Sequence, residues 1–283
     1  SSSASPPAAR ALPRGAWMRE RPNNQAAGLL DLAAMPSPKL TAMVAHGDEQ
    51  AELPLLLRMC AAWVGFGYPV TVLDGTVRES ADNPGLEQLL DYSYAAPPAS
   101  DAPSWAVIPA AWGLQTLASQ QRAERNALRD TGWMFPHESV VIVYCTAQTL
   151  VPLLQGSCVR PVLTVSTAKA SLLTSYLALK RLLLKGKLEP TIVNVLPAPH
   201  TVSSRTGIQT ASTGLRDYAK YFLDYEVNAL TIPAPGVDDR PSATTERLAL
   251  GLLENALPLD LRWTPTPPSI SKRVAVSAML GSH

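Results

Sequence analysis

The chain alternates short apolar strands with helical segments, and this alternation restricts its fold more than any other feature. Residues 139–145 read SVVIVYC, a nearly continuous β-branched run that is typical of a parallel strand buried on both faces. Further strands are expected at 40–45, 68–76, 104–110, 159–166, 189–196 and 227–235, and helices at 54–66, 83–92, 113–130, 171–185, 212–225 and 244–257. This order predicts an α/β fold, with a doubly wound, mostly parallel sheet and helices on both faces.

The two ends of the chain differ in composition from this α/β body. Residues 1–22 are rich in Ser, Ala, Pro and Arg and are expected to form a flexible arm, and 258–283 form a Pro-rich, basic tail. A short helix is expected within 23–38. The sequence therefore predicts one α/β domain at 39–257, preceded by a short helix and flanked by two tails.

Charge and cysteine usage exclude several classes of function. The net charge of +1 provides no overall attraction to nucleic acid or to an anionic membrane. The three cysteines and four histidines lack the spacing of a metal site, which predicts reduced, buried thiols and no bound metal. No stretch reaches the ~18 apolar residues of a membrane span. We therefore expect a soluble, cytoplasmic protein that binds neither nucleic acid nor membrane directly.

The loop at 46–53 lies where a βαβ nucleotide-binding unit would cradle phosphates. Such a loop needs glycines, a lysine for the phosphates and a Ser or Thr for Mg²⁺. Here it reads HGDEQAEL and carries three acids, Asp48, Glu49 and Glu52. A carboxylate about 4 Å from one phosphate charge costs about 4 kcal/mol at an effective dielectric of about 20. The sequence thus argues against nucleoside triphosphate binding and predicts no cofactor.

Two interpretations of the acidic loop remain open. Carboxylates at the start of a helix interact favourably with its dipole, by about 0.3–1 kcal/mol each, and Pro54 suits a first helical turn. In the preferred interpretation, the chain's own carboxylates occupy the place of a phosphate. In the alternative, the three acids form a site for a cation or a basic peptide.

Over residues 39–257 the pattern resembles the MinD/ParA class of deviant P-loop ATPases. Counted back from the strand that ends at Asp74, the class would place its signature lysine at Gly47, its P-loop lysine at Glu52 and its Mg²⁺-binding hydroxyl at Leu53. Asp74 itself agrees with the class. The resemblance therefore implies a MinD-like fold with a degenerate nucleotide site, a pseudo-ATPase rather than an enzyme.

Two further positions can be compared with functional positions of this class. Tyr144 stands where the class has an acid that organises Mg²⁺ and water, and Asn194 stands where it often has an asparagine that reads adenine. Without phosphate binding, Asn194 is expected to be structural and Asp74 to cap a turn. His46 ends the first strand, and the sequence shows no nucleophile or metal site beside it.

Residues 24–30 read NQAAGLL and are similar to the D-Q-A-x-x-L-R motif of the FlhG subgroup, the flagellar-number regulators. Gln25, Ala26 and Leu29 match the motif, whereas Asn24 and Leu30 depart from it. In that subgroup the motif helix stimulates a signal-recognition-type GTPase, FlhF. The resemblance implies partner contacts at Asn24, Gln25, Ala26 and Leu29, and the alternative is a short helix that docks on the body.

Three hypotheses of function follow from these features. The first is a non-hydrolysing MinD/FlhG-like regulator, recruited to a membrane-associated complex, that controls flagellar placement or number through a GTPase partner. The second is a scaffold of a secretion or exopolysaccharide (cellulose) synthesis machine. The third is an unusual nucleotide-binding ATPase that uses Asp74 and Asn194. The acidic loop disfavours the third, and only the 24–30 motif favours the first over the second.

Overall fold

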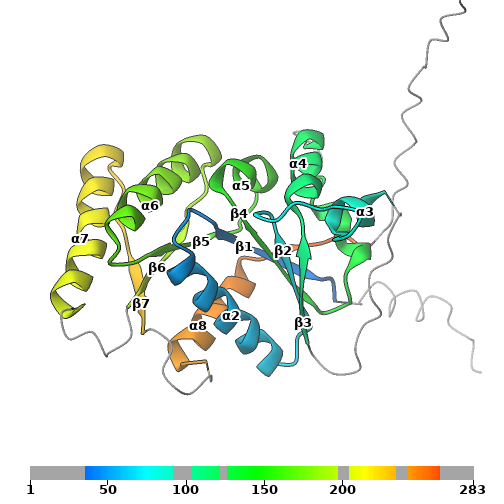
Figure 1. Ribbon diagram of the computed structural model, residues 1–283, viewed down its shortest axis with the longest axis horizontal. Helices are drawn as coiled ribbons and strands as arrows, with labels where there is room; N and C mark the ends of the chain where they lie inside the picture. Colours follow the sequence, from blue (N-terminus) through cyan, green and yellow to red (C-terminus); the bar gives the residue numbers. More distant parts are fainter. Residues whose placement is uncertain (1–35, 92–103, 122–125, 197–203, 234–240, 262–283) are drawn as a thin grey trace, which may run out of the picture. The chain divides into compact units, whose positions relative to one another are not determined.

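The computed structural model describes residues 36–91, 104–121, 126–196, 204–233 and 241–261, which belong to the unit Pro36–His283. Its sheet has the order β3-β2-β4-β1-β5-β6-β7, with β8 beside β1 (Figure 1). The strands are β1 (Lys39–Val44), β2 (Val70–Asp74), β3 (Trp105–Pro109), β4 (Val140–Cys145), β5 (Val162–Val165), β6 (Thr191–Val195), β7 (Ala229–Ile232) and β8 (Leu257–Pro258). All pairings are parallel except that of β8 with β1.

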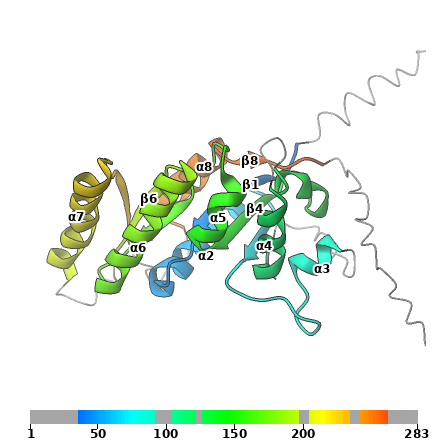
Figure 2. The ribbon, with the colours of Figure 1, turned by 90° about the horizontal axis from the view of Figure 1, so that it is seen from above.

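Helices cover both faces of the sheet. The helices are α2 (Glu49–Gly65), α3 (Leu86–Leu90), α4 (Ala111–Gln120), α5 (Ala147–Leu154), α6 (Lys169–Arg181), α7 (Ser204–Leu223) and α8 (Ala243–Glu254). Buried residues of α2 and α8 pack on one face, and those of α3 to α7 pack on the other. Helices α4, α5, α6 and α7 follow one another in a row (Figure 2). The predicted α/β class, a doubly wound and mostly parallel sheet, is confirmed.

The centre of the sheet brings four strand ends together. In the register, Met43 of β1 is paired with Tyr144 of β4 on one side and with Val162 of β5 on the other. Asp74, the last residue of β2, is paired with Tyr144 as well. Since parallel strands present their carboxyl ends at the same edge, the β1–α2 loop lies beside the ends of β4 and β5.

Helices α2 and α7 begin more than one turn earlier than the sequence predicted. Helix α2 starts at Glu49 and contains Pro54, whereas the prediction began the helix at Pro54 itself. Asp48 is its N-cap residue, so the acidic segment forms the first turn of the helix. Helix α7 starts at Ser204 rather than at 212. In both cases polar residues without an apolar period extend the helix at its N-terminal end.

The helix predicted over 113–130 is wrong in its second half. Helix α4 ends at Gln120, because Gln121 has an extended backbone and its side chain accepts a hydrogen bond from the Ala127 amide at 2.9 Å. Residues Arg129–Met134 then form a 3-10 helix. Three further differences concern short elements: α5 and β8 were not predicted, and the helix predicted over 244–257 ends at Glu254.

The cysteines differ in their surroundings. Cys60 and Cys145 are buried as expected, whereas Cys158 is exposed. Burial raises the pKa of the Cys60 thiol to about 12 and also raises that of Cys145. Both buried thiols therefore stay protonated at neutral pH and are poor nucleophiles. Within the described ranges, no helix is both long and apolar enough to cross a membrane.

Candidate functional site

The loop between β1 and α2 lies at the carboxyl edge of the sheet, where the sequence analysis placed the degenerate nucleotide site. Gly47 has a φ of +94°, a left-handed conformation that a side chain would strain, and a Cβ built there meets nothing within 4 Å. The glycine is therefore required by backbone conformation rather than by crowding. The turn it makes points the amides of His46 and Asp48 at one carboxylate.

That carboxylate belongs to Glu52, whose side chain is fully buried. Its Oε1 accepts hydrogen bonds from the His46 amide at 3.0 Å and from the Asp48 amide at 2.8 Å. Its Oε2 accepts the hydroxyl hydrogen of Tyr144 at 2.5 Å. Amides at the start of a helix are the groups that bind phosphate in phosphate-binding loops. In this protein a carboxylate of the same chain binds two of them.

His46 is held in the same cluster from both ring nitrogens. Its Nδ1 lies 2.9 Å from the Thr174 hydroxyl, and its Nε2 lies 3.0 Å from both the carbonyl and the hydroxyl oxygen of Thr164. Nε2 also lies 3.4 Å from Glu52 Oε1, and the imidazole is only 3% exposed. The structure thus surrounds His46 with hydroxyl groups that sequence reasoning did not place there. These contacts fix the ring between β1, β5 and α6.

Asp48 joins this loop to the loop between β5 and α6. Its Oδ2 accepts the hydroxyl hydrogen of Ser166 at 2.5 Å, and the Ser166 amide donates to the Ser171 hydroxyl at 3.1 Å. Helix α6 begins at Lys169, two residues before the start at residue 171 that the sequence predicted. Two of the three loop acids therefore have internal donors, and only Glu49 is exposed.

A metal site is one of the interpretations that the acidic loop left open. Among the residues that the structure describes, no group of three or more His, Cys, Asp and Glu side chains could hold a metal ion. Glu52 and Asp48 instead accept hydrogen bonds from groups of the protein itself. The geometry favours the interpretation in which the chain's own carboxylate takes the place of a phosphate.

Tyr144 closes the cluster from β4. It is buried, and its hydroxyl donates to Glu52 rather than remaining unpaired. Burial, the hydrogen bond to Glu52 and the negative charges of Glu52, Asp74 and Glu49 raise the pKa of the phenol. The Tyr144 hydroxyl therefore remains protonated, and able to donate, over the whole neutral range.

The other predicted nucleotide-site positions lie apart from this cluster. Asp74 Oδ1 accepts hydrogen bonds from the Thr76 amide at 2.9 Å and hydroxyl at 2.6 Å, the turn-capping role expected from the sequence. Leu53 is 39% exposed on the outside of α2. Asn194 is buried, but its neighbours Val193 and Val195 pack on the α2 face, so its side chain faces the opposite side of the sheet from Tyr144.

Glu79 is a second internal carboxylate that the sequence analysis missed. It is 7% exposed, and it accepts hydrogen bonds from the amides of Trp112 at 2.8 Å, Gly113 at 2.9 Å and Glu87 at 3.3 Å. These amides belong to the first turns of α3 and α4. Amides in the first turn of a helix have no hydrogen-bond acceptor within the helix itself. Glu79 lies 33 residues before Trp112 in the sequence, so no local pattern could have predicted that it caps α4.

Asn24, Gln25, Ala26 and Leu29, the predicted partner-binding residues, lie outside the described residues. The structure therefore neither supports nor contradicts the contacts that were predicted for them.

Comparison with known proteins gives a likeness of fold. No family model and no curated protein matches the chain. Similar solved structures include the MinC:MinD cell division protein complex of Aquifex aeolicus, with 13% identity over 78% of this chain and 98% of that one and a TM-score of 0.48. Cobyrinic acid a,c-diamide synthase from Mycobacterium smegmatis has 15% identity over 77% and 94%, with a TM-score of 0.48. The ParA family ATPase of Chlorobium tepidum has 11% identity over 76% and 98%, with a TM-score of 0.47.

Proposed function

We propose that this protein is a pseudo-ATPase with a MinD-like fold that acts through protein contacts and hydrolyses no nucleotide. The observation that carries the proposal is the position of the Glu52 carboxylate, which binds the His46 and Asp48 amides. A triphosphate needs these amides and a nearby cation. This chain instead has Glu52 at the position compared with the P-loop lysine, and two more acids, Asp48 and Glu49, in the same loop.

Displacing Glu52 by a phosphate would be costly. The carboxylate would have to leave the Tyr144 hydroxyl, its partner at 2.5 Å, inside the core. A buried hydroxyl without a partner costs about 1–3 kcal/mol. The displaced charge would also remain near the phosphate, which adds repulsion of about 4 kcal/mol at 4 Å and an effective dielectric of about 20. Together these terms disfavour phosphate binding by about 5–7 kcal/mol.

Thermal denaturation with Mg²⁺ and ATP tests the proposal. A ligand present at about 100 times its Kd stabilises the folded state by about 2.7 kcal/mol, so even weak specific binding raises the Tm at millimolar ATP. We expect no change in the Tm.

The narrower form of the proposal is a regulator of a signal-recognition-type GTPase through the helix expected at 23–38. Its support is the NQAAGLL sequence at 24–30. Gln25→Ala in the full-length protein should leave the Tm unchanged and abolish most of any stimulation of partner GTP hydrolysis, because a glutamine can orient the attacking water. Asn23→Ala, outside the motif, is the control. Equal stimulation by both variants would contradict this assignment.

A further inference from the structure

Helices α6 and α7 carry large apolar side chains on their solvent side. Tyr221 is 82% exposed and Leu173 61%. The α6–α7 surface, as we define it, consists of Leu173, Leu177, Leu184, Tyr218, Tyr221 and Phe222. Single exposed apolar residues are common, but these six form a patch of the kind that marks a contact site. They lie on α6, on the π-helical turn Leu182–Gly186 that follows it, and on the neighbouring α7.

The two helices join into one continuous surface. The Tyr176 ring of α6 lies between them, with its centroid 6.1 Å from Tyr218 and 6.3 Å from Phe222. The Tyr218 and Phe222 rings are stacked on each other at 6.1 Å. Gly214 allows close approach, because a Cβ there would lie 3.2 Å from Leu172 Cδ2 of α6. The Tyr176 ring therefore links the apolar side chains of the two helices, and the exposed Lys180 lies between Leu177 and Leu184 in the sequence.

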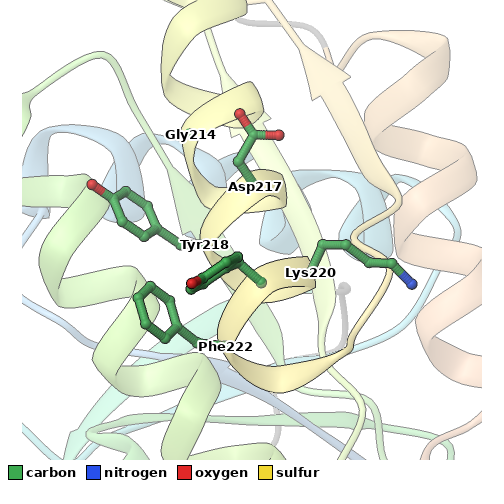
Figure 3. A pocket seen from close by; sticks show the side chains of 6 residues that line it. Gly214, Asp217, Tyr218, Lys220 and Phe222 are labelled. Carbon is green, nitrogen blue, oxygen red and sulfur yellow. The ribbon is translucent and has the colours of Figure 1, made fainter.

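The α7 part of this surface is concave. A pocket is lined by Gly214, Asp217, Tyr218, Lys220, Tyr221 and Phe222. Figure 3 shows Tyr218 and Phe222 pointing to the same side of α7, with Lys220 directed to the other side. A concave site accepts a projecting side chain, whereas a flat lipid surface cannot fill it. A bilayer would also have to dehydrate the Asp217 carboxylate at the wall of the pocket.

The charges around the surface indicate the chemistry of the partner. The sequence from 169 to 186 contains no acid, and Lys180, Arg181 and Lys185 are exposed on it. On α7, Lys220 is paired with Asp224 at 3.1 Å. A second copy of this chain that packed α6 against α6 would bring the cations of the two helices together, which is unfavourable. An occupant with apolar anchors and acidic flanks complements both the leucines and the cations.

We propose that the α6–α7 surface binds an amphipathic helix of another protein, with apolar anchors at i, i+3 or i+4, and i+7 and with acidic residues at its flanks. The aromatic rings of α7 receive the central anchor, and the cations of α6 contact the acids. None of the residues of the α6–α7 surface belongs to the β1–α2 loop or to the 24–30 motif. The proposal of a helical partner therefore does not depend on the proposed function.

Selection from a displayed peptide library tests the proposal with the full-length protein. Helix-compatible peptides of about 18 residues, or about five turns, are selected on the wild type. We expect enriched peptides to share the apolar spacing and to carry more acids than bases. A selected peptide should bind Tyr221→Ser/Phe222→Ser at least about tenfold more weakly, and Lys180→Glu/Arg181→Glu about fivefold more weakly, with unchanged affinity for the control Leu250→Ser on α8. No enrichment, enrichment of basic peptides or equal binding by all variants would overturn the proposal.

Two further measurements separate the other possible occupants. Vesicles of phosphatidylglycerol test a membrane, and sedimentation of the wild type tests a second copy. We expect neither vesicle binding nor a dimer that depends on Tyr221 and Phe222. Vesicle binding would show that the occupant of the surface is a lipid membrane, and such a dimer would show that it is a second copy of the chain. Either finding would contradict the proposal of a helical partner. Because none of these measurements involves nucleotide, their failure leaves the ATP titration, and hence the pseudo-ATPase proposal, unaffected.

Discussion

Replacing Glu52 with alanine is expected to lower the free energy of unfolding by roughly 3–9 kcal/mol, since each of three buried groups left without a partner costs about 1–3 kcal/mol. The substitution leaves three donors without their acceptor: the amides of His46 and Asp48 and the hydroxyl of Tyr144. Urea denaturation at neutral pH measures the loss. A water molecule that enters the vacated space would place the result at the lower end of the range.

Glu49→Ala is the matched control, because Glu49 lies in the same helical turn but is exposed. Its effect should remain within about 0.5 kcal/mol. Glu52→Gln, which keeps the shape and one acceptor oxygen, should fall between the two alanine variants. Similar small losses for Glu52→Ala and Glu49→Ala would show that the carboxylate is not an internal ligand of the loop.

The second large effect is expected for Tyr144→Asp, which should destabilise the protein by several kcal/mol, on the order of 3–5, by burying an unpaired carboxylate. The new acid would stand beside Glu52 and next to Asp74 in the strand register. The resemblance to the MinD/ParA class implies an acid at this position, so the substitution makes the sequence more similar to that class. We expect lost stability and no gain of nucleotide binding.

Tyr144→Phe separates the hydrogen bond from the packing. It removes only the hydroxyl, but it leaves Glu52 Oε2 without its donor, so a loss of about 1–3 kcal/mol is expected. Unfolding curves of the two variants should therefore differ clearly. An Asp variant as stable as the wild type would mean that this position is open to solvent and that the Glu52 cluster is not closed.

Glu52 and Glu79 illustrate the same physical device. Each is a buried carboxylate that accepts hydrogen bonds from amides at the start of a helix, where the backbone has no partners of its own. Glu52 serves α2 and the loop before it, and Glu79 serves α3 and α4. Amides at or just before the starts of α2, α3 and α4 thereby find acceptors within the protein.

The sheet could be predicted because its strands have a strong local pattern. Strand β4 is a continuous apolar run that is buried throughout, and most residues of β1, β2 and β6 are buried as well, as is typical of parallel strands. Helix α5 was missed because it has only eight residues and contains Pro152. Strand β8 was missed because it consists of two residues that exist as a strand only through pairing with β1.

The candidate site was predictable in part. The acids of the loop and the burial of Tyr144 followed from local sequence. That Glu52, rather than Asp48 or Glu49, fills the loop depends on the strand order, which places Tyr144 within 2.5 Å of it. The contacts of His46 with Thr164 and Thr174 join residues more than a hundred positions apart. No periodicity or motif could have indicated them.

Calorimetric titration of the wild-type protein with ATP in the presence of Mg²⁺ tests the central claim most directly. A MinD/ParA-class ATPase with an intact P-loop serves as the positive control in the same buffer. Because the Glu52 carboxylate occupies the amides that a phosphate would need, we predict no saturable heat at millimolar ATP. A saturable isotherm with a Kd below about 100 μM, equivalent to more than about 5 kcal/mol of binding free energy, would contradict the pseudo-ATPase proposal.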